Sequence, residues 1–194
     1  MRYRASVVIG CIVSVLGYAP AHAEVRWFDV GRSTLTVYVP AADRHAESPP
    51  HTITATLSEG SLDEMVVPPH LTLVINLEDF LIVSPTRSAD AREEFRQYLL
   101  GPGGLNEERY SRITYHSLTI DISEPEVWLI TGELGMHGRF LPFNVTVRRK
   151  GDRFTGNTMV IPAEFGVAAV DDKGNSVPLA NEVRVEFDLV LESP

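Results

Sequence analysis

Apolar and polar residues alternate along most of this chain with a period of two. In 181–193, for example, Val183, Val185 and Phe187 fall on one face, and Arg184 and Glu186 on the other. Because successive side chains of a strand point to opposite faces, this pattern predicts strands with one apolar face. Eight strands are predicted, at 26–39, 51–63, 71–83, 112–122, 126–138, 141–151, 152–161 and 181–193.

One segment, TRSADAREEFRQYLL at 86–100, has the period of a helix instead. Phe95 and Leu99 fall on one helical face, and Asp90 with Glu93 fits a capping box. The glycine and proline that follow are typical of a helix end. We therefore predict one short helix within an otherwise all-β chain.

Regularly spaced strands separated by turn residues are typical of an antiparallel sandwich or barrel. The pattern alone leaves these two architectures open. A barrel of about eight strands is either filled by its own side chains or holds one small ligand. No internal repeat or linker divides the pattern, so we predict a single domain over residues 24–194.

The N-terminus has the features of a secretory signal peptide. Arg2 and Arg4 precede the apolar run ASVVIGCIVSVLGYA, and AHA at 21–23 fits a cleavage site. We predict cleavage after residue 23, a periplasmic location, and no stable membrane span in the mature protein. An uncleaved anchor and a lipoprotein attached through Cys11 are the alternatives.

Removal of residues 1–23 changes the composition in two ways. Cys11 is the only cysteine, so the mature chain has no disulfide and no cysteine-ligated metal. Two of the 17 basic residues are lost and none of the 26 acidic ones, which leaves a net charge of −11. Nucleic acid is therefore excluded as a predicted partner, and adsorption to an anionic membrane is disfavoured.

The stretch GELGMHG at 132–138 carries three glycines among alternating residues. Glycine in a strand marks a bend or a close approach between backbones, and this is the predicted role. The alternative is a backbone cradle for an anionic group, although the spacing is not that of a phosphate loop.

Candidate catalytic chemistry is sparse. His116 and His137 lie on predicted strands and would be the residues of a metal- or small-substrate-dependent enzyme if they met across neighbouring strands. The other histidines of the mature chain lie near predicted loops, and no histidine spacing defines a metal site. No catalytic residue, metal or cofactor is predicted.

Four segments, in order, resemble the YceI-like family. VWLITGELGMHGRFLPFNVTV follows the family signature V-x-G-x-L-T-[IVL]-x-G-x-[TS]-x-P-[VF]-x-[LF]-x-V at Gly132, Leu134, Gly138, Pro142, Phe143 and Val145. WFDVGRSTLTVYV resembles the opening strand, with Ser33 at the usual serine. The other two matches are carried by Tyr110, Ile113, Tyr115 and Ser117, and by Glu164, Phe165 and Gly166.

The chain departs from the family pattern at three places. Pro162 stands where the family usually has arginine, Arg139-Phe140-Leu141 replaces a threonine-centred turn, and 41–70 carries extra prolines and histidines. These departures affect the identity of a ligand more than the fold. The role of 41–70 is left open.

The resemblance implies an eight-stranded antiparallel, lipocalin-like barrel with an apolar lumen. Family members are periplasmic or secreted, hold a long isoprenoid chain, and are not known for a catalytic apparatus. We therefore expect a non-enzymatic carrier of an isoprenoid or other long apolar molecule. A filled barrel that acts in stress or as an interaction module, and a homodimer, are left open. The predicted lumen residues are Leu35, Val37, Ile113, Tyr115, Phe143, Val145, Phe187 and Leu189.

Overall fold

The computed structural model of the protein describes residues 25–40, 51–170, 176–178 and 182–193. The predicted signal peptide and the loop at 41–50 lie outside these residues. Within them, eleven strands form one antiparallel sheet, two more strands form a separate pair, and there is one α-helix. None of the described helices is both long and apolar enough to cross a membrane.

The sheet has the strand order β1-β4-β5-β7-β8-β9-β10-β13-β2-β3-β6. Its strands are β1 (Arg26–Trp27), β2 (Thr34–Val39), β3 (His51–Thr56), β4 (Glu59–Asp63), β5 (His70–Asn76), β6 (Leu81–Ile82), β7 (Arg112–Glu124), β8 (Val127–Met136), β9 (Arg139–Lys150), β10 (Arg153–Val160) and β13 (Val183–Val190). The remaining elements are α1 (Ala89–Leu100), the 3₁₀ turns η1 (Leu77–Asp79) and η2 (Pro162–Phe165), and the pair β11 (Ala168–Val170) and β12 (Ser176–Pro178).

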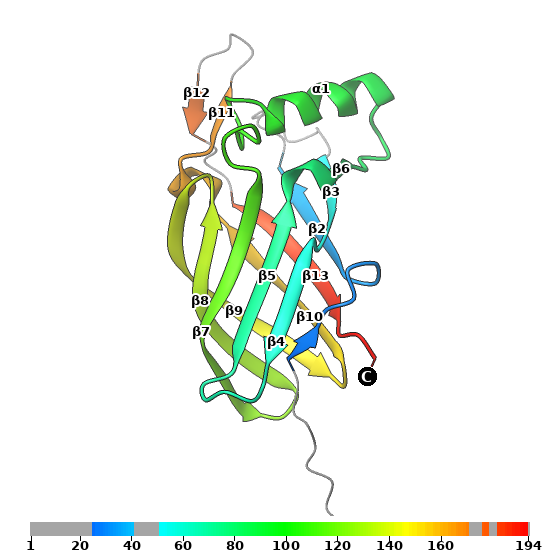
Figure 1. Cartoon of the computed structure of the whole chain (residues 1–194). Helices are drawn as coiled ribbons and strands as arrows, with labels where there is room; N and C mark the ends of the chain where they lie inside the picture. Colours follow the sequence, from blue (N-terminus) through cyan, green and yellow to red (C-terminus); the bar gives the residue numbers. More distant parts are fainter. Residues whose placement is uncertain (1–24, 41–50, 171–175, 179–181, 194) are drawn as a thin grey trace, which may run out of the picture.

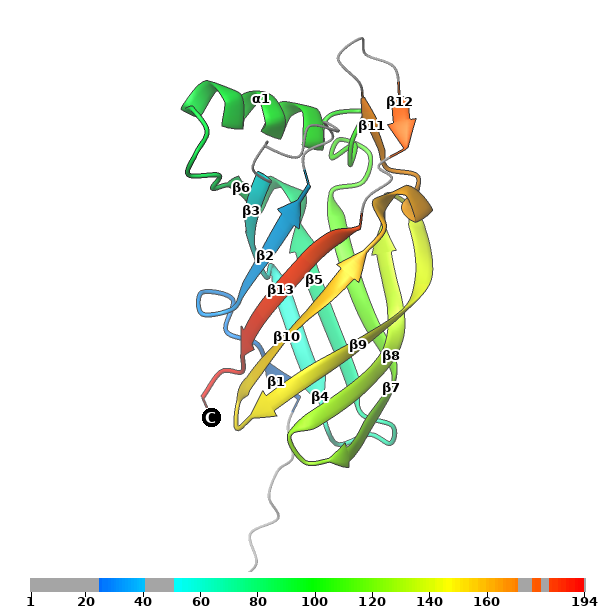
Figure 2. The same cartoon turned by 180° about the vertical axis from the view of Figure 1, so that it is seen from behind.

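The sheet curls into a barrel (Figures 1 and 2). β2 pairs with β3, and β4, which follows β3 after only Leu57 and Ser58, pairs with β5. One stretch of chain thus links strands from opposite ends of the strand order. The helix α1 lies across one end of the barrel, on the same side as β11 and β12 (Figure 1).

The predicted all-β, antiparallel class with one α-helix is confirmed, but the predicted count of eight strands is wrong. The stretch predicted as one strand at 51–63 bends at Leu57 and Ser58 into β3 and β4. The stretch at 71–83, predicted as one bent strand, is interrupted by η1 and gives β5 and the two-residue β6. The stretch at 26–39 gives β1 and β2. Periodicity does not register such breaks, because apolar residues continue on both sides of each bend.

The helix begins three residues later than predicted, and its cap differs from the predicted one. Ser88 is the N-cap, and its Oγ accepts a hydrogen bond of 3.2 Å from the backbone N–H of Ala91. Asp90, predicted to cap with Glu93, lies inside the first turn instead. The predicted end of the helix is confirmed, because Gly101 is its C-cap.

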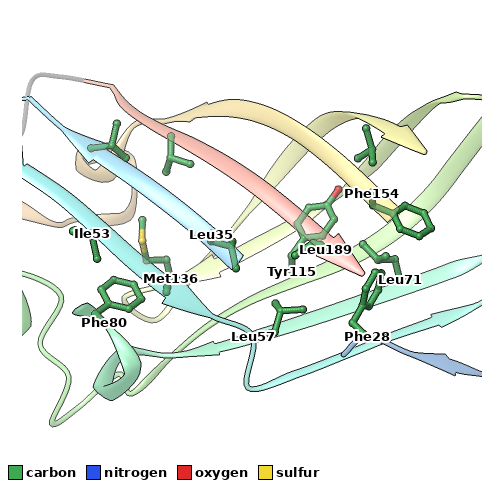
Figure 3. Close-up of a cluster of buried hydrophobic side chains, with 14 of the residues drawn as sticks. Phe28, Leu35, Ile53, Leu57, Leu71, Phe80, Tyr115, Met136, Phe154 and Leu189 are labelled. Atoms are coloured by element: carbon green, nitrogen blue, oxygen red, sulfur yellow. The ribbon is translucent and has the colours of Figure 1, made fainter. Parts of the chain in front are cut away.

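The inward faces of the strands form one continuous apolar core. Figure 3 shows Phe28, Leu71, Phe154 and Leu189 toward one end of this core and Ile53, Phe80 and Met136 toward the other, with Tyr115 between them. Two fully or nearly buried serines satisfy backbone donors at its margin. Val190 N–H donates to Ser33 Oγ at 3.0 Å, and Leu71 N–H donates to Ser117 Oγ at 2.7 Å.

Candidate ligand-binding cavity

The interior of the barrel contains a cavity of about 350 Å³. This volume falls within the range of about 300–1,000 Å³ that is typical of small-molecule pockets. Among the described residues that line it, there is no lysine, arginine, aspartate or glutamate. A site with these properties accepts hydrocarbon and offers no counter-charge for an ion.

All eight predicted lumen residues line this cavity. β2 contributes Leu35 and Val37, β7 contributes Ile113 and Tyr115, β9 contributes Phe143 and Val145, and β13 contributes Phe187 and Leu189. The alternating pattern thus identified the correct face on each of these four strands. Leu35, Tyr115 and Leu189 are buried, and the other five are partly buried.

The sequence analysis missed the lining residues that other elements contribute. These come from β3, β5, β8, β10 and α1, and include Ile53, Ala55, Leu73, Ile130, Thr158 and Phe95. The same alternation in 51–63 and 71–83 was available to find the strand residues. The alternation could not reveal the contribution of α1, because this contribution depends on how the helix docks on the barrel.

Tyr115 places a hydroxyl group in the apolar wall. Its Oη donates to the backbone carbonyl of Phe143 at 3.2 Å, with the carbonyl of Ile130 at 3.4 Å. Burial raises the pKa of Tyr115 to about 12, so the phenol is neutral at neutral pH. Gly132 makes room for this ring, because a Cβ there would lie 2.7 Å from the Tyr115 hydroxyl oxygen.

The glycine-rich stretch therefore has the predicted role of close approach. A Cβ at Gly132 would also lie 2.4 Å from the carbonyl oxygen of His116 on the neighbouring strand. Gly138 has φ +74° in the turn between β8 and β9, and the Tyr110 ring packs against it. The spaces beside both glycines are occupied by protein atoms.

Aromatic side chains close the cavity at the end away from α1. The ring of Phe154 packs edge-on against Phe28 and Trp128, with centroids 5.5 and 5.4 Å apart. The Arg149 guanidinium lies 4.5 Å from the centre of the Trp128 ring. Its two terminal nitrogens bind both carboxylate oxygens of Glu64, at 2.6 and 3.2 Å. This bidentate pair holds the cation over the aromatic base.

The helix α1 covers the opposite end. Phe95, Tyr98 and Leu99 from one face of α1 line the cavity. The Phe95 ring stacks on the ring of His51, the first residue of β3, with centroids 3.6 Å apart. The predicted apolar pair Phe95 and Leu99 is thus confirmed as the face that α1 turns toward the barrel.

The two histidines that were predicted to lie on strands do not come together, and the prediction is wrong for His137, which follows the end of β8. The Nδ1 of His116 lies 3.3 Å from the hydroxyl oxygen of Thr72 on the outside of the barrel. His137 lies in the β8–β9 turn, where its Nδ1 is 3.2 Å from the carbonyl oxygen of Phe165 and its ring packs on Tyr110. In the described part of the chain, no three histidine, cysteine, aspartate or glutamate residues form a metal site.

The fold and the cavity define a class of protein, the antiparallel β-barrel with an apolar interior. The chain belongs to the YceI-like domain family, which it matches over residues 51–191. This confirms the family predicted from the four sequence segments.

Two solved structures illustrate the similarity. The crystal structure of BcnA from Burkholderia cenocepacia has a TM-score of 0.62 and 16% sequence identity, and the match covers 86% of this chain and 99% of that one. The YceI protein of Campylobacter jejuni has a TM-score of 0.49 and 13% identity, covering 73% of this chain and 82% of that one. At 16% identity, the likeness to BcnA concerns the fold. Among curated proteins, no match is found.

Proposed function

We propose that this protein is an exported, non-enzymatic carrier that holds an isoprenoid or similar long apolar molecule in a lipocalin-like barrel. The observation that carries the proposal is the cavity itself, about 350 Å³ in volume, whose described lining residues include no lysine, arginine, aspartate or glutamate. The eight lumen residues predicted from the sequence are proposed as ligand-binding residues, together with the apolar face of α1. The periplasm is the proposed location.

The energetics support an apolar chain as the occupant. Each methylene buried from water stabilises binding by about 0.8 kcal/mol. A chain of some twenty carbons would therefore offset the loss of translational and rotational freedom, which costs about 4–15 kcal/mol. The alternative enzyme was based on a meeting of His116 and His137, and these histidines have separate partners. The filled-barrel alternative is not favoured, because the interior keeps an open volume.

Native mass spectrometry of the protein from the periplasm of its own host tests the proposal directly. We expect a stoichiometric adduct of a few hundred daltons that solvent extraction releases as a lipid. A bare protein mass, combined with no uptake of added polyprenyl lipids, would contradict the carrier function.

A matched pair of variants then tests the location of the site. Val145 faces the cavity, whereas Thr146, next to it on β9, is exposed. We expect Val145→Trp to fill the lumen and reduce the affinity for an apolar fluorescent probe at least tenfold. Thr146→Trp adds the same ring to the same strand and should leave the affinity unchanged. Equal effects of the two substitutions would show that the probe binds elsewhere.

A further inference from the structure

His51 is a polar residue at the α1 end of the cavity that the proposed function does not yet use. It begins β3 and lines the cavity beside Phe95 of α1. The two rings stack almost in parallel, with an interplanar angle of 6° and a centroid distance of 3.6 Å. The stack fixes the plane of the imidazole beside the cavity.

The Nδ1 atom of His51 is buried and has no hydrogen-bond partner. Of the residues with buried, unpaired side-chain polar atoms in the described chain, only His51 lines the cavity. The hydroxyl of Tyr115, deeper in the cavity, is bonded to backbone carbonyls. A buried polar atom without a partner is destabilising, and a ligand that supplied the missing hydrogen bond would remove this cost.

The imidazole is neutral at neutral pH. Burial, and next the positive charge of Arg87, lower the pKa of His51 to about 4. A neutral imidazole has one nitrogen that donates and one that accepts, and which is which depends on the tautomer. We assign His51 the tautomer with the proton on Nε2, so that Nδ1 accepts a hydrogen bond. A ligand hydroxyl can donate this bond, and an ether oxygen cannot.

Charged head groups fit this position less well. The described lining residues include no lysine, arginine, aspartate or glutamate, so an ammonium next to His51 would lose water without gaining a counter-ion from them. A phosphate would also lose water, and its counter-charge would be Arg87, whose charge acts on His51 but which is not among the described lining residues. The nearby charge of Arg87 further disfavours a cation. A neutral, hydrogen-bonding head group has neither cost.

We propose that His51 is a specificity-determining residue that binds the terminal hydroxyl group of the apolar ligand, so that the carried molecule is a long-chain alcohol. This inference rests on the proposed carrier function, because it assigns a head-group position within the same cavity. The apolar chain lies in the lumen, and the hydroxyl group lies at the α1 end beside the His51–Phe95 stack.

The test uses the full chain, stripped of lipid, and three probes with one twenty-carbon chain: geranylgeraniol, its methyl ether and geranylgeranyl phosphate. The ether keeps the oxygen but cannot donate a hydrogen bond, and the phosphate adds charge. We expect the alcohol to bind about fivefold to tenfold more tightly than the ether, as one hydrogen bond provides, and more tightly than the phosphate. His51→Phe should remove the preference for the alcohol and keep the affinity for the ether.

Two further variants separate recognition from folding. His51→Gln keeps a hydrogen-bonding side chain and should retain part of the preference. His116→Phe makes the same change to a histidine on the outside of the barrel and should behave like the wild-type protein. Equal affinities for alcohol and ether in the wild type, tighter binding of the phosphate, or an unchanged preference in His51→Phe would overturn the inference. If none of the three probes binds, the carrier proposal itself fails.

Discussion

Gly132 is the residue at which the smallest change should disturb the barrel. A Cβ there would lie 2.4 Å from the carbonyl oxygen of His116, which belongs to the backbone of β7 and cannot turn away. We expect Gly132→Ala to destabilise the protein by about 2–3 kcal/mol through overpacking. Thermal unfolding should show a decrease in Tm of roughly 5–10 °C.

Gly31→Ala is the control for this substitution. The nearest atom to a Cβ at Gly31 is Asp29 Oδ1 at 3.5 Å, which is an ordinary contact. We expect Gly31→Ala to change the Tm by no more than a few degrees. An equally mild effect at Gly132 would show that β7 and β8 are able to move apart.

The buried phenol of Tyr115 makes stability depend on alkaline pH. Burial raises its pKa from 10.0 to about 12, so between these values the unfolded chain ionises while the folded protein stays protonated. The unfolded state therefore binds fewer protons, and the free energy of unfolding falls as pH rises from about 10 to 12, by about 2–3 kcal/mol. Denaturant unfolding at pH 9 and pH 11.5 should show this loss in the wild type and a smaller one in Tyr115→Phe.

At the scale of the residue, the sequence best predicted which face of a strand each side chain occupies, because this face follows from the period of two. The eight predicted lumen residues all line the cavity because alternation fixes which side of a strand each residue occupies. His51 and Phe95 were not predicted to meet, although both are visible in the sequence. Their stack joins β3 to α1, and a contact between elements far apart in the chain leaves no periodic pattern.

At the scale of the element, the position of α1 depends on how its N-terminus is capped. The hydroxyl of Ser88 accepts a hydrogen bond from Ala91 N–H, whereas Asp90 lies within the first turn. We expect Ser88→Ala to destabilise the helix by about 1 kcal/mol, since it leaves a backbone donor without its partner. Amide hydrogen exchange should be faster in the first turn of α1.

Asp90→Ala distinguishes the observed cap from the one predicted from the sequence. Asp90 and Glu93 fit a capping-box pattern, whereas Ser88 is followed three residues later by Ala91 and does not. The pattern alone therefore does not identify the first helical residue. We expect Asp90→Ala to change stability by less than about 0.5 kcal/mol. If Asp90→Ala accelerates exchange more than Ser88→Ala, then Asp90 is the cap in solution.

The breaks between strands also belong to this scale. β3 and β4 were predicted as one strand because Ile53, Ala55 and Leu57 continue the same alternation up to the bend. The bend follows from what each half pairs with: β3 with β2, and β4 with β5. Tertiary pairing of this kind explains why the fold class was predictable and the strand count was not.

At the scale of the whole molecule, the two ends of the barrel differ in construction. The end away from α1 is closed by the aromatic rings of Phe28, Trp128 and Phe154, with Arg149 and Glu64 over them. The other end is covered by Phe95, Tyr98 and Leu99 of α1, and the Phe95 ring stacks on His51 of β3. Arg96 of α1 also donates a hydrogen bond of 3.4 Å to the carbonyl of Glu78. Because α1 is a separate helix packed over this end and is not part of the sheet, we expect a ligand to exchange there.

This asymmetry is testable because Cys11 is the only cysteine, so a Cys11→Ser background carries a single introduced thiol. Tyr98→Cys places the thiol at the α1 end, and Val67→Cys places it on a residue that is 97% exposed in the turn between β4 and β5. We expect a bulky maleimide label at position 98 to slow the uptake of an apolar fluorescent probe at least tenfold in stopped-flow measurements. The same label at position 67 should leave the rate unchanged, and the reverse result would place the opening at the aromatic base.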